Sequence, residues 1–365
     1  METSDNIIAV LGAGHGGSAM AGHLAIMGYR VNLFNRSEER IWGIKSTGGI
    51  EVKGEVEGFG RLNNCSTSMK ETIEEAEFIM VVVPAFAHRW MAEQVAPYLR
   101  DGQIIILHPG RTFGALEFKQ VLNEHKVTAD AIVAEAQTFI YASRVIGPGQ
   151  VRIFKIKNSV PVASIRAHLI PKLLKKLKIM YPQFVAGDNI FKTSFDNIGS
   201  IFHPAISLLN AGWIENDEEF DFYHAGVTAS VARVLEKVDA ERIEVAEALG
   251  IRAMSSLQWL YMAYNTTGTN LYEAIHKNPG YQGIKAPRTL RMRYLDEDVP
   301  FSLVPIASAG KMLGIDTPAI NTLVNLASIA NERDYWAEGR TVERLGIEKM
   351  SLRELRLFAI GEQMR

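Results

Sequence analysis

The sequence contains one cysteine, almost no net charge and no hydrophobic run long enough to cross a membrane. Cys65 has no second cysteine with which to form a disulfide, which is typical of a reducing compartment. The 39 basic and 41 acidic residues nearly balance, so no overall field favours nucleic acid. The most apolar stretch, Phe78–Ala87, is short and contains a proline. We therefore expect a cytoplasmic globular protein with neither a nucleic-acid nor a membrane partner.

Patterns typical of metal sites and of common hydrolases are also missing. The nine histidines show no H-x-x-x-H spacing, and a single cysteine cannot supply a C-x-x-C pair. No G-x-S-x-G motif marks a nucleophilic serine. We expect no metal cofactor.

The 365 residues suffice for two domains, and the hydrophobic pattern changes near residue 185. Residues 1–185 alternate short apolar runs with amphipathic stretches, which predicts a doubly wound α/β sheet. The expected parallel strands are Ile7–Leu11, Arg30–Asn35, Phe78–Val83, Gln103–Leu107 and Ala131–Glu135. Ile50–Leu62 predicts an inserted hairpin, and Gly147–Ile156 an antiparallel strand at the sheet edge.

Strand patterns stop in residues 186–365, which predicts an all-α domain that binds substrate. The expected helices are Lys192–Asn210, Ala225–Leu249, Met254–Tyr264, Pro300–Leu313 and Ala319–Asn331. We expect a hinge in residues 183–190, with closure of one domain over the other at a shared cleft.

A glycine-rich loop directly follows the first expected strand and opens a helix. It reads Gly12-Ala13-Gly14-His15-Gly16-Gly17. In this setting Gly12 permits a tight turn, Gly14 lets a pyrophosphate approach the backbone, and Gly17 lets helix and strand pack closely. Free N–H groups at the helix start attract the phosphate charge. The loop predicts a Rossmann domain that binds a dinucleotide.

The residues after the second strand distinguish NAD from NADP. NAD sites usually place a carboxylate there for the ribose 2′-hydroxyl. This chain has Asn35-Arg36-Ser37 instead, which supplies donors for a 2′-phosphate. Arg36 could equally be an exposed side chain at a tolerant site. We favour NADP over NAD.

Other strand ends should lie around the same cofactor, because ligands bind at the carboxyl ends of such strands. We expect Val83, Pro84 and Ala85 to flank the ribose and Glu135 to lie near the nicotinamide. His108 ends a further strand, where a positional role is favoured over a catalytic one.

The expected helix Lys192–Asn210 carries a polar stripe at helical spacing. Its members are Asp196, Ser200, His203, Ser207 and Asn210. The stripe is polar yet nearly uncharged, which suggests a cleft wall rather than a solvent face. Pro204 removes a helical hydrogen bond next to His203, so we expect a kink there. His203 is the candidate functional group, and a structural histidine is the alternative.

Four segments together resemble the octopine/nopaline (opine) dehydrogenase family. They are the glycine loop, Asn197…His203-Pro204, Glu236–Arg242, and Arg293-Tyr294…Glu297-Asp298-Val299-Pro300. The likeness covers almost the whole chain and is nearest to the bacterial N-(1-carboxyethyl)norvaline dehydrogenase type, with a helical domain like that of 6-phosphogluconate dehydrogenase. It implies an NAD(P)H-dependent enzyme that condenses an α-keto acid such as pyruvate with an amino acid and reduces the imine.

The resemblance also implies roles for single residues. His203 would be the general acid/base and Asp298 the carboxylate that orients it. The implied substrate-binding residues are Arg144, Asn197, Trp259 and Arg293. Without the resemblance, Asp298 could be a helix N-cap and Trp259 a core residue. The segment Glu236–Arg242 is interpreted as helix packing and salt bridges.

Two other functions stay open at this point. A simple keto acid or ketone reductase, like ketopantoate reductase or glycerol-3-phosphate dehydrogenase, would use a lysine such as Lys192. A non-catalytic NADPH sensor would bind cofactor without turnover. Helical second domains of such enzymes often form a dimer face, so we expect a homodimer.

Overall fold

The structure is a computed structural model that describes residues 6–216 and 218–360 and divides the chain into two compact units. The first unit ends at Thr193 and also includes residues from Glu354 onward; the second is Ser194–Arg353. The division thus falls later than residue 185. The reason lies in α7 (Ile190–Phe195), because Thr193 donates a hydrogen bond to Glu135 and Phe191 packs edge-on against Phe113.

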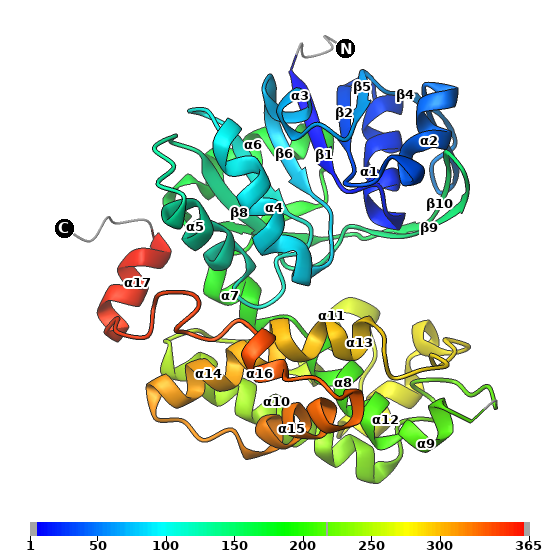
Figure 1. Ribbon diagram of the computed structural model, residues 1–365. Helices are drawn as coiled ribbons and strands as arrows, with labels where there is room; N and C mark the ends of the chain where they lie inside the picture. The colour runs from blue at the N-terminus through cyan, green and yellow to red at the C-terminus, as the bar shows by residue number, and fades with distance from the viewer. Residues whose placement is uncertain (1–5, 217, 361–365) are drawn as a thin grey trace. The chain divides into compact units, whose positions relative to one another are not determined.

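The first unit contains an eight-stranded sheet in the order β12-β11-β8-β7-β6-β1-β2-β5, with helices on both faces (Figure 1). Its strands are β1 (Ile7–Leu11), β2 (Arg30–Phe34), β5 (Asn64–Ser66), β6 (Ala76–Val81), β7 (Ile104–Leu107), β8 (Ile132–Ala136), β11 (Val160–Ser164) and β12 (Phe184–Ala186). The five predicted parallel strands are confirmed. The chain runs outward from β1 to β2 and β5, then returns to β6 on the other side of β1. Such a switch point is where doubly wound sheets bind ligands.

The helices of this unit cover the sheet and connect its strands. They are α1 (His15–Ile26), α2 (Glu38–Thr47), α3 (Met69–Ile73), α4 (His88–Val95), α5 (Gly114–Glu124), α6 (Ile170–Met180), α7 and α17 (Leu352–Ile360), with 3₁₀ turns η1 (Ala85–Ala87), η2 (Ala96–Tyr98) and η3 (Ala167–Leu169). Most of α17 belongs to this unit, contrary to the expected assignment of the whole C-terminal part to the helical domain.

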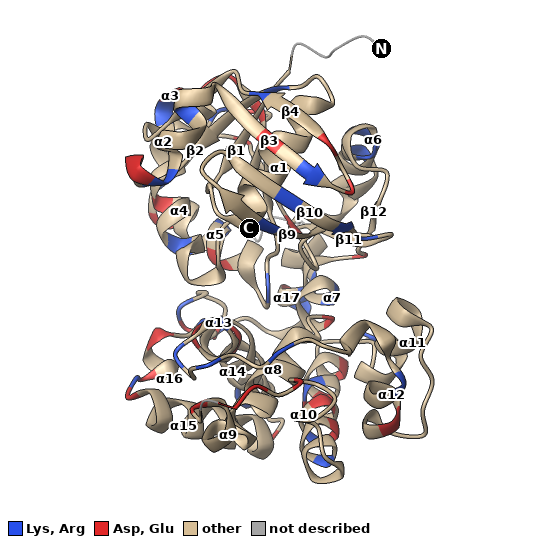
Figure 2. Ribbon diagram, turned by 90° about the vertical axis from the view of Figure 1, so that its right-hand side faces the viewer, with Lys and Arg blue, Asp and Glu red and all other residues tan. Residues whose placement is uncertain are grey.

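A second sheet has the order β4-β3-β10-β9 and packs against α1. Its strands are β3 (Gly49–Gly54), β4 (Gly58–Arg61), β9 (Tyr141–Gly147) and β10 (Gln150–Ile156). The predicted hairpin is confirmed as the antiparallel pair β3–β4. The prediction that residues 147–156 extend the edge of the main sheet is wrong, because β10 lies beside β3 and β9 (Figure 2). Val151 and Ile153 of β10 are fully buried, so burial against α1 favours this placement.

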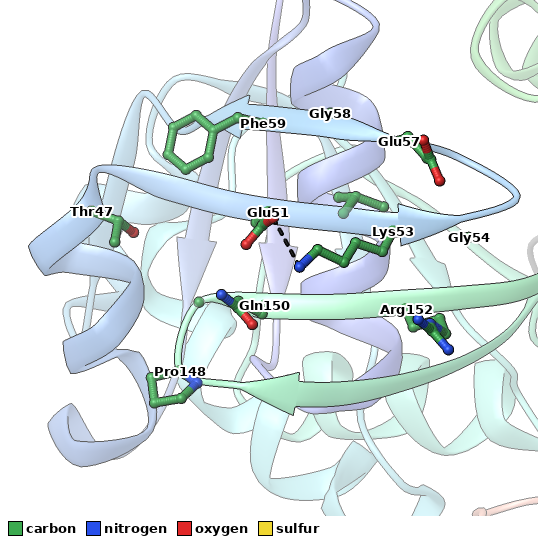
Figure 3. A pocket seen from close by; sticks show the side chains of 12 residues that line it. Thr47, Glu51, Lys53, Gly54, Glu57, Gly58, Phe59, Pro148, Gln150 and Arg152 are labelled. Carbon is green, nitrogen blue, oxygen red and sulfur yellow. Dashed lines mark ion pairs between the residues drawn. The ribbon is translucent and has the colours of Figure 1, made fainter.

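The outer face of this second sheet has a hollow of about 670 Å³. Figure 3 shows side chains of both charge signs along it, including the ion pair between Glu51 and Lys53 at 3.0 Å. Phe59 lies at its rim and is about half exposed. None of the predicted site residues lines this hollow.

Among the described residues of the second unit, helices joined by loops are the only regular secondary structure, apart from one isolated bridge between Asp221 and Lys285. Its elements are α8 (Gly199–Leu209), α9 (Ala211–Ile214), α10 (Ala229–Ala248), α11 (Ser256–Tyr264), α12 (Leu271–Lys277), η4 (Pro279–Tyr281), α13 (Arg293–Asp296), the π-helical η5 (Val299–Leu303), α14 (Val304–Leu313), α15 (Pro318–Asn331) and α16 (Tyr335–Glu338). No helix in the described part of the chain is long and apolar enough to cross a bilayer.

The predicted helix over residues 192–210 is in fact two helices, α7 and α8. The polar residues between them form tertiary hydrogen bonds that replace helical ones. Asp196 accepts the N–H of Met254 at 2.8 Å, and Asn197 donates to Ser302 Oγ at 2.8 Å.

The segment Glu236–Arg242 of α10 connects several helices, as the sequence predicts. Glu236 accepts the N–H of Leu271 at the start of α12, and Glu241 accepts two N–H groups at the start of α15. Asp239 and Arg242 form a buried ion pair at 2.6 Å. These carboxylates favour helix N-termini, where unsatisfied N–H groups carry partial positive charge.

Candidate active site

The turn between β1 and α1 has the tight geometry that a dinucleotide pyrophosphate requires. Gly12 has φ +110°, and a Cβ there would lie 2.5 Å from the carbonyl oxygen of Val82. A Cβ on Gly17 would lie 1.6 Å from the carbonyl oxygen of Gly12. Both positions therefore require glycine, and α1 begins directly after the turn, as in sites where a helix N-terminus binds phosphate.

His15 differs from the other residues of this loop in where its side chain points. Its Nδ1 accepts the backbone N–H of Val145 in β9 at 2.9 Å, and its carbonyl accepts the hydroxyl of Ser143. The imidazole therefore ties α1 to the second sheet, and only the backbone of His15 is placed to contribute to the phosphate turn.

The residues after β2 are connected to the glycine loop. Asn35 Oδ1 accepts the N–H of Ala13 at 3.2 Å, while its amide nitrogen donates to the carbonyl of Ser37 at 3.0 Å. The Arg36 guanidinium lies over the ring of Trp90 in α4, 5.9 Å from the centroid. Arg36 is thus exposed, but a cation–π contact holds its side chain in place. This favours a role in binding a 2′-phosphate over the alternative of a freely moving side chain.

The loop after β6 lies beside the glycine turn. The Cγ1 atom of Val83 would be 2.8 Å from a Cβ on Gly12. Pro84 is exposed and Ala85 is buried at the start of η1. The strands β1, β2 and β6 are parallel neighbours, so the segments that follow them lie at one edge of the sheet. These segments are residues 12–17, 35–37 and 83–85, the predicted cofactor-binding residues.

Glu135 and His108 are both buried at the ends of their strands. Glu135 accepts the N–H of Ala115 at 2.9 Å and the hydroxyl of Thr193 at 2.7 Å, so its carboxylate connects the start of α5 to α7. This geometry favours a structural role over the predicted cofactor contact. Burial lowers the pKa of His108 to about 3, so its imidazole is neutral near pH 7. That agrees with the positional interpretation of His108.

The second unit brings His203 and Asp298 together. His203 Nδ1 lies 2.7 Å from Asp298 Oδ2. The Asp298 side chain is 1% exposed and the His203 side chain 20% exposed, so the carboxylate is buried behind a partly accessible imidazole. Asp298 stands at the N-cap position of η5, but its side chain makes no capping hydrogen bond there, which favours the pairing with His203 over a capping role. The pair has the arrangement in which a carboxylate fixes the tautomer and orientation of a histidine.

Tyr294 belongs to this cluster and was missed in the sequence. Its ring is stacked on the His203 imidazole, with 4.2 Å between centroids and 14° between planes. The available signal was its spacing, because Tyr294 precedes Asp298 by about one helical turn. Trp90 was missed as well, and no local pattern connects it to Arg36.

The interpretation of the α8 stripe as a cleft wall is wrong for most of its members. Ser200 and Ser207 are fully buried, since α10, α13 and α15 pack around α8. Ser200 donates to the carbonyl of Asn197 at 2.7 Å. Within the stripe, His203 and Asn210 are partly accessible, and Asn210 donates to the carbonyls of Ile206 and Gly226.

The predicted substrate-binding residues occupy different environments. Arg293 has a 61% exposed side chain and pairs with the buried Glu297 at 3.1 Å. Asn197 is buried, and its bond to Ser302 favours a structural role. Trp259 is half-buried and contacts Phe202, so its burial does not decide between a residue that lines a pocket and a core residue. Arg144 is exposed on β9 of the first unit.

The described residues hold no cluster of three or more His, Cys, Asp or Glu side chains that could bind a metal ion. Cys65 is half-buried, and burial raises its thiol pKa to about 11, so it is a poor nucleophile.

Comparison with known proteins identifies the family. The alpha-helical domain of NAD/NADP octopine/nopaline dehydrogenases matches residues 186–331, and the NAD-binding domain of 6-phosphogluconate dehydrogenase matches residues 7–127. An opine dehydrogenase of Arthrobacter sp. (strain 1C) is 35% identical over 349 residues, 95% of this chain and 97% of that protein. The chain belongs to the opine dehydrogenase family. It is an NAD(P)-dependent oxidoreductase, as the sequence predicts.

More distant relatives share the fold. Octopine dehydrogenase of Pecten maximus is 23% identical over 294 residues, 73% of each chain. A structure of octopine dehydrogenase with NADH and L-arginine superposes with a TM-score of 0.83 at 21% identity, covering 99% of both chains. A structure of yersinopine dehydrogenase with NADP⁺ bound gives 0.77 at 16% identity, covering 100% and 99%. The predicted combination of a Rossmann unit and a helical unit is confirmed.

Proposed function

We propose that the protein catalyses the NAD(P)H-dependent reductive condensation of an α-keto acid such as pyruvate with the amino group of an amino acid. The amine and the keto group form an imine with loss of water. One hydride from the nicotinamide and one proton then add across the C=N bond. The products are the secondary amine, NAD(P)⁺ and water.

The observation that carries this proposal is the hydrogen bond of 2.7 Å between His203 Nδ1 and Asp298 Oδ2. A histidine titrates near neutral pH, so it can give up a proton and regain it within one turnover. The buried carboxylate holds Nδ1, which leaves Nε2 to transfer the proton. A cofactor-binding sensor would have no use for this pair.

We propose that residues of the first unit bind the dinucleotide cofactor. The glycine turn would hold the pyrophosphate through backbone N–H groups, because its two closest approaches leave no room for a side chain. The bound nicotinamide supplies the hydride. Asn35, Arg36 and Ser37 place no carboxylate beside the adenosine ribose, and Arg36 offers a cation for a 2′-phosphate.

Replacing Arg36 with alanine should therefore weaken NADPH more than NADH. Loss of one charge-assisted hydrogen bond costs about 1.5–3 kcal/mol, which corresponds to a roughly 10- to 100-fold rise in the NADPH dissociation constant. Fluorescence titration of both cofactors measures this, and NADH serves as the internal control. Equal weakening of both would contradict a 2′-phosphate role for Arg36.

The two product carboxylates call for cationic partners, for which we propose Arg293 and Arg144. Arg293 is the better placed of the two, since it lies next to Tyr294 in the segment that carries Asp298. Its side chain keeps most of its surface exposed despite the pair with Glu297, and a guanidinium carries five N–H donors, so donors remain for a substrate carboxylate. We propose that Trp259 contacts the amino-acid side chain.

The deciding experiment follows NADPH and NADH oxidation with pyruvate, alone and with a pool of L-amino acids. Oxidation that depends on the amino acids supports the proposal, and dividing the pool identifies the amine. Oxidation with the keto acid alone, unchanged by amino acids, supports a simple reductase. Cofactor binding without turnover across a panel of keto acids supports the sensor. Size-exclusion chromatography of the same preparation tests the expected homodimer.

A further inference from the structure

An aromatic ring, that of Tyr294, lies over the imidazole of His203 and has no role in the proposed reaction so far. Tyr294 and His203 lie face to face, and Phe222 lies 5.1 Å from the phenol ring and 6.5 Å from the imidazole. One face of the imidazole is therefore covered by an aromatic ring while Asp298 holds its Nδ1 edge. Two independent contacts fix the plane of the imidazole.

We propose that Tyr294 is a positioning residue for His203, which it holds in one orientation and stabilises in the protonated form. The proposal rests on the proposed role of His203 as proton donor. The face of an aromatic ring carries partial negative charge, so it attracts an imidazolium more strongly than a neutral imidazole. The geometry suits this contact, because the two rings are nearly parallel and well within 6 Å.

One short segment supplies both contacts. Tyr294 lies at the start of α13, and Asp298 immediately precedes η5. A shift of this segment relative to α8 would move the stacking ring and the carboxylate together. Residues 293–298 thus act as a single support for the imidazole.

Neighbouring charged groups on the elements around α8 are engaged with other partners. The pairs are Arg293 with Glu297, Asp296 with Arg333, Asp239 with Arg242, and Glu241 with the first N–H groups of α15. Burial raises the pKa values of Tyr294 and Tyr223, so both phenols are neutral near pH 7. Asp298 makes the hydrogen bond and the Tyr294 ring the stacking contact that hold the imidazole.

An NMR titration of the histidine side chains in the full-length protein tests the proposal. Signals of His203 are identified by their absence in His203→Gln. In Tyr294→Leu we expect the His203 midpoint to fall by roughly half a unit to one pH unit, because the imidazolium loses its cation–π contact. Its ring-proton signals should also lose the upfield shift caused by the stacked ring. Tyr294→Phe keeps the ring and should keep both the midpoint and the shift.

An unchanged midpoint in Tyr294→Leu, with the other histidine signals in place to show that the chain is folded, would overturn the proposal. So would a midpoint that moves equally in Tyr294→Phe, since the hydroxyl rather than the ring face would then be responsible. The titration needs no substrate. Absence of opine-forming activity would therefore count against the proposed function alone.

Kinetics give a second readout that a merely structural role would not move. In the reductive direction the protonated histidine is required, so activity falls as pH rises through the imidazolium midpoint. Tyr294→Leu should shift this alkaline limb to lower pH by the same amount as the NMR midpoint. A raised KM with an unshifted limb would instead make Tyr294 a substrate contact and overturn the proposal.

Discussion

Replacing His203 with glutamine should reduce kcat by about 10²- to 10⁴-fold, the usual contribution of a general acid or base. Glutamine keeps a polar group near Asp298 but cannot transfer a proton in the working range. NADPH binding should be unchanged, because the glycine turn and the residues after β2 belong to the first unit. Steady-state kinetics in the reductive direction and cofactor titration together measure the two effects.

Ser207→Ala is the matched control for this variant. Ser207 lies one turn further along α8, is buried, and its hydroxyl has no hydrogen-bond partner. Its removal should leave kcat unaffected and stability equal or slightly higher. The double variant His203→Gln/Asp298→Asn should lose no more activity than His203→Gln, because the two residues act as a unit.

Lys192→Ala separates the proposed mechanism from that of a simple reductase. Lys192 lies in α7, whose first turn is capped by Asn189. If Lys192→Ala abolished turnover while His203→Gln kept it, the His203 mechanism would be wrong and the lysine-based reduction would stand in its place.

The cofactor-binding half of the molecule was largely predictable because its determinants are local. A strand, a glycine turn and a helix follow one another in residues 7–26, and the steric limits at Gly12 and Gly17 leave little choice of residue. The departures involve contacts between distant segments, such as β10 joining β3 and Thr193 bonding to Glu135.

The candidate site was less predictable because its geometry depends on distant segments meeting. Helical spacing identified His203, but the serines beside it in the stripe proved buried, since periodicity cannot tell a cleft from the interior. Family resemblance supplied Asp298, and the structure shows the hydrogen bond. For Tyr294 the sequence offered only its spacing of about one helical turn before Asp298, and for Trp90 it offered no signal, because a cation–π contact between distant segments leaves no fixed spacing.

Replacing Arg242 with methionine should destabilise the protein by about 3–5 kcal/mol, the usual effect of breaking a buried ion pair. The guanidinium is fully buried, pairs with Asp239, and donates to the carbonyls of Phe195 and Met254. Its removal leaves the buried Asp239 carboxylate without its cation, with the N–H of Ser256 as a remaining donor, and takes one donor from each of the two carbonyls. Thermal and urea unfolding of the full chain measure the loss.

Two further variants show whether the unpaired charge is the cause. Lys237→Met removes the exposed partner of Glu241 and should change stability by less than about 1 kcal/mol. Asp239→Asn combined with Arg242→Met removes both charges and should recover part of the loss. Equal losses in the single and double variants would mean that packing, not charge, governs this site.

Phe195 ends α7 just before the turn into α8, so Arg242→Met should also lower kcat by loosening the helix that carries His203.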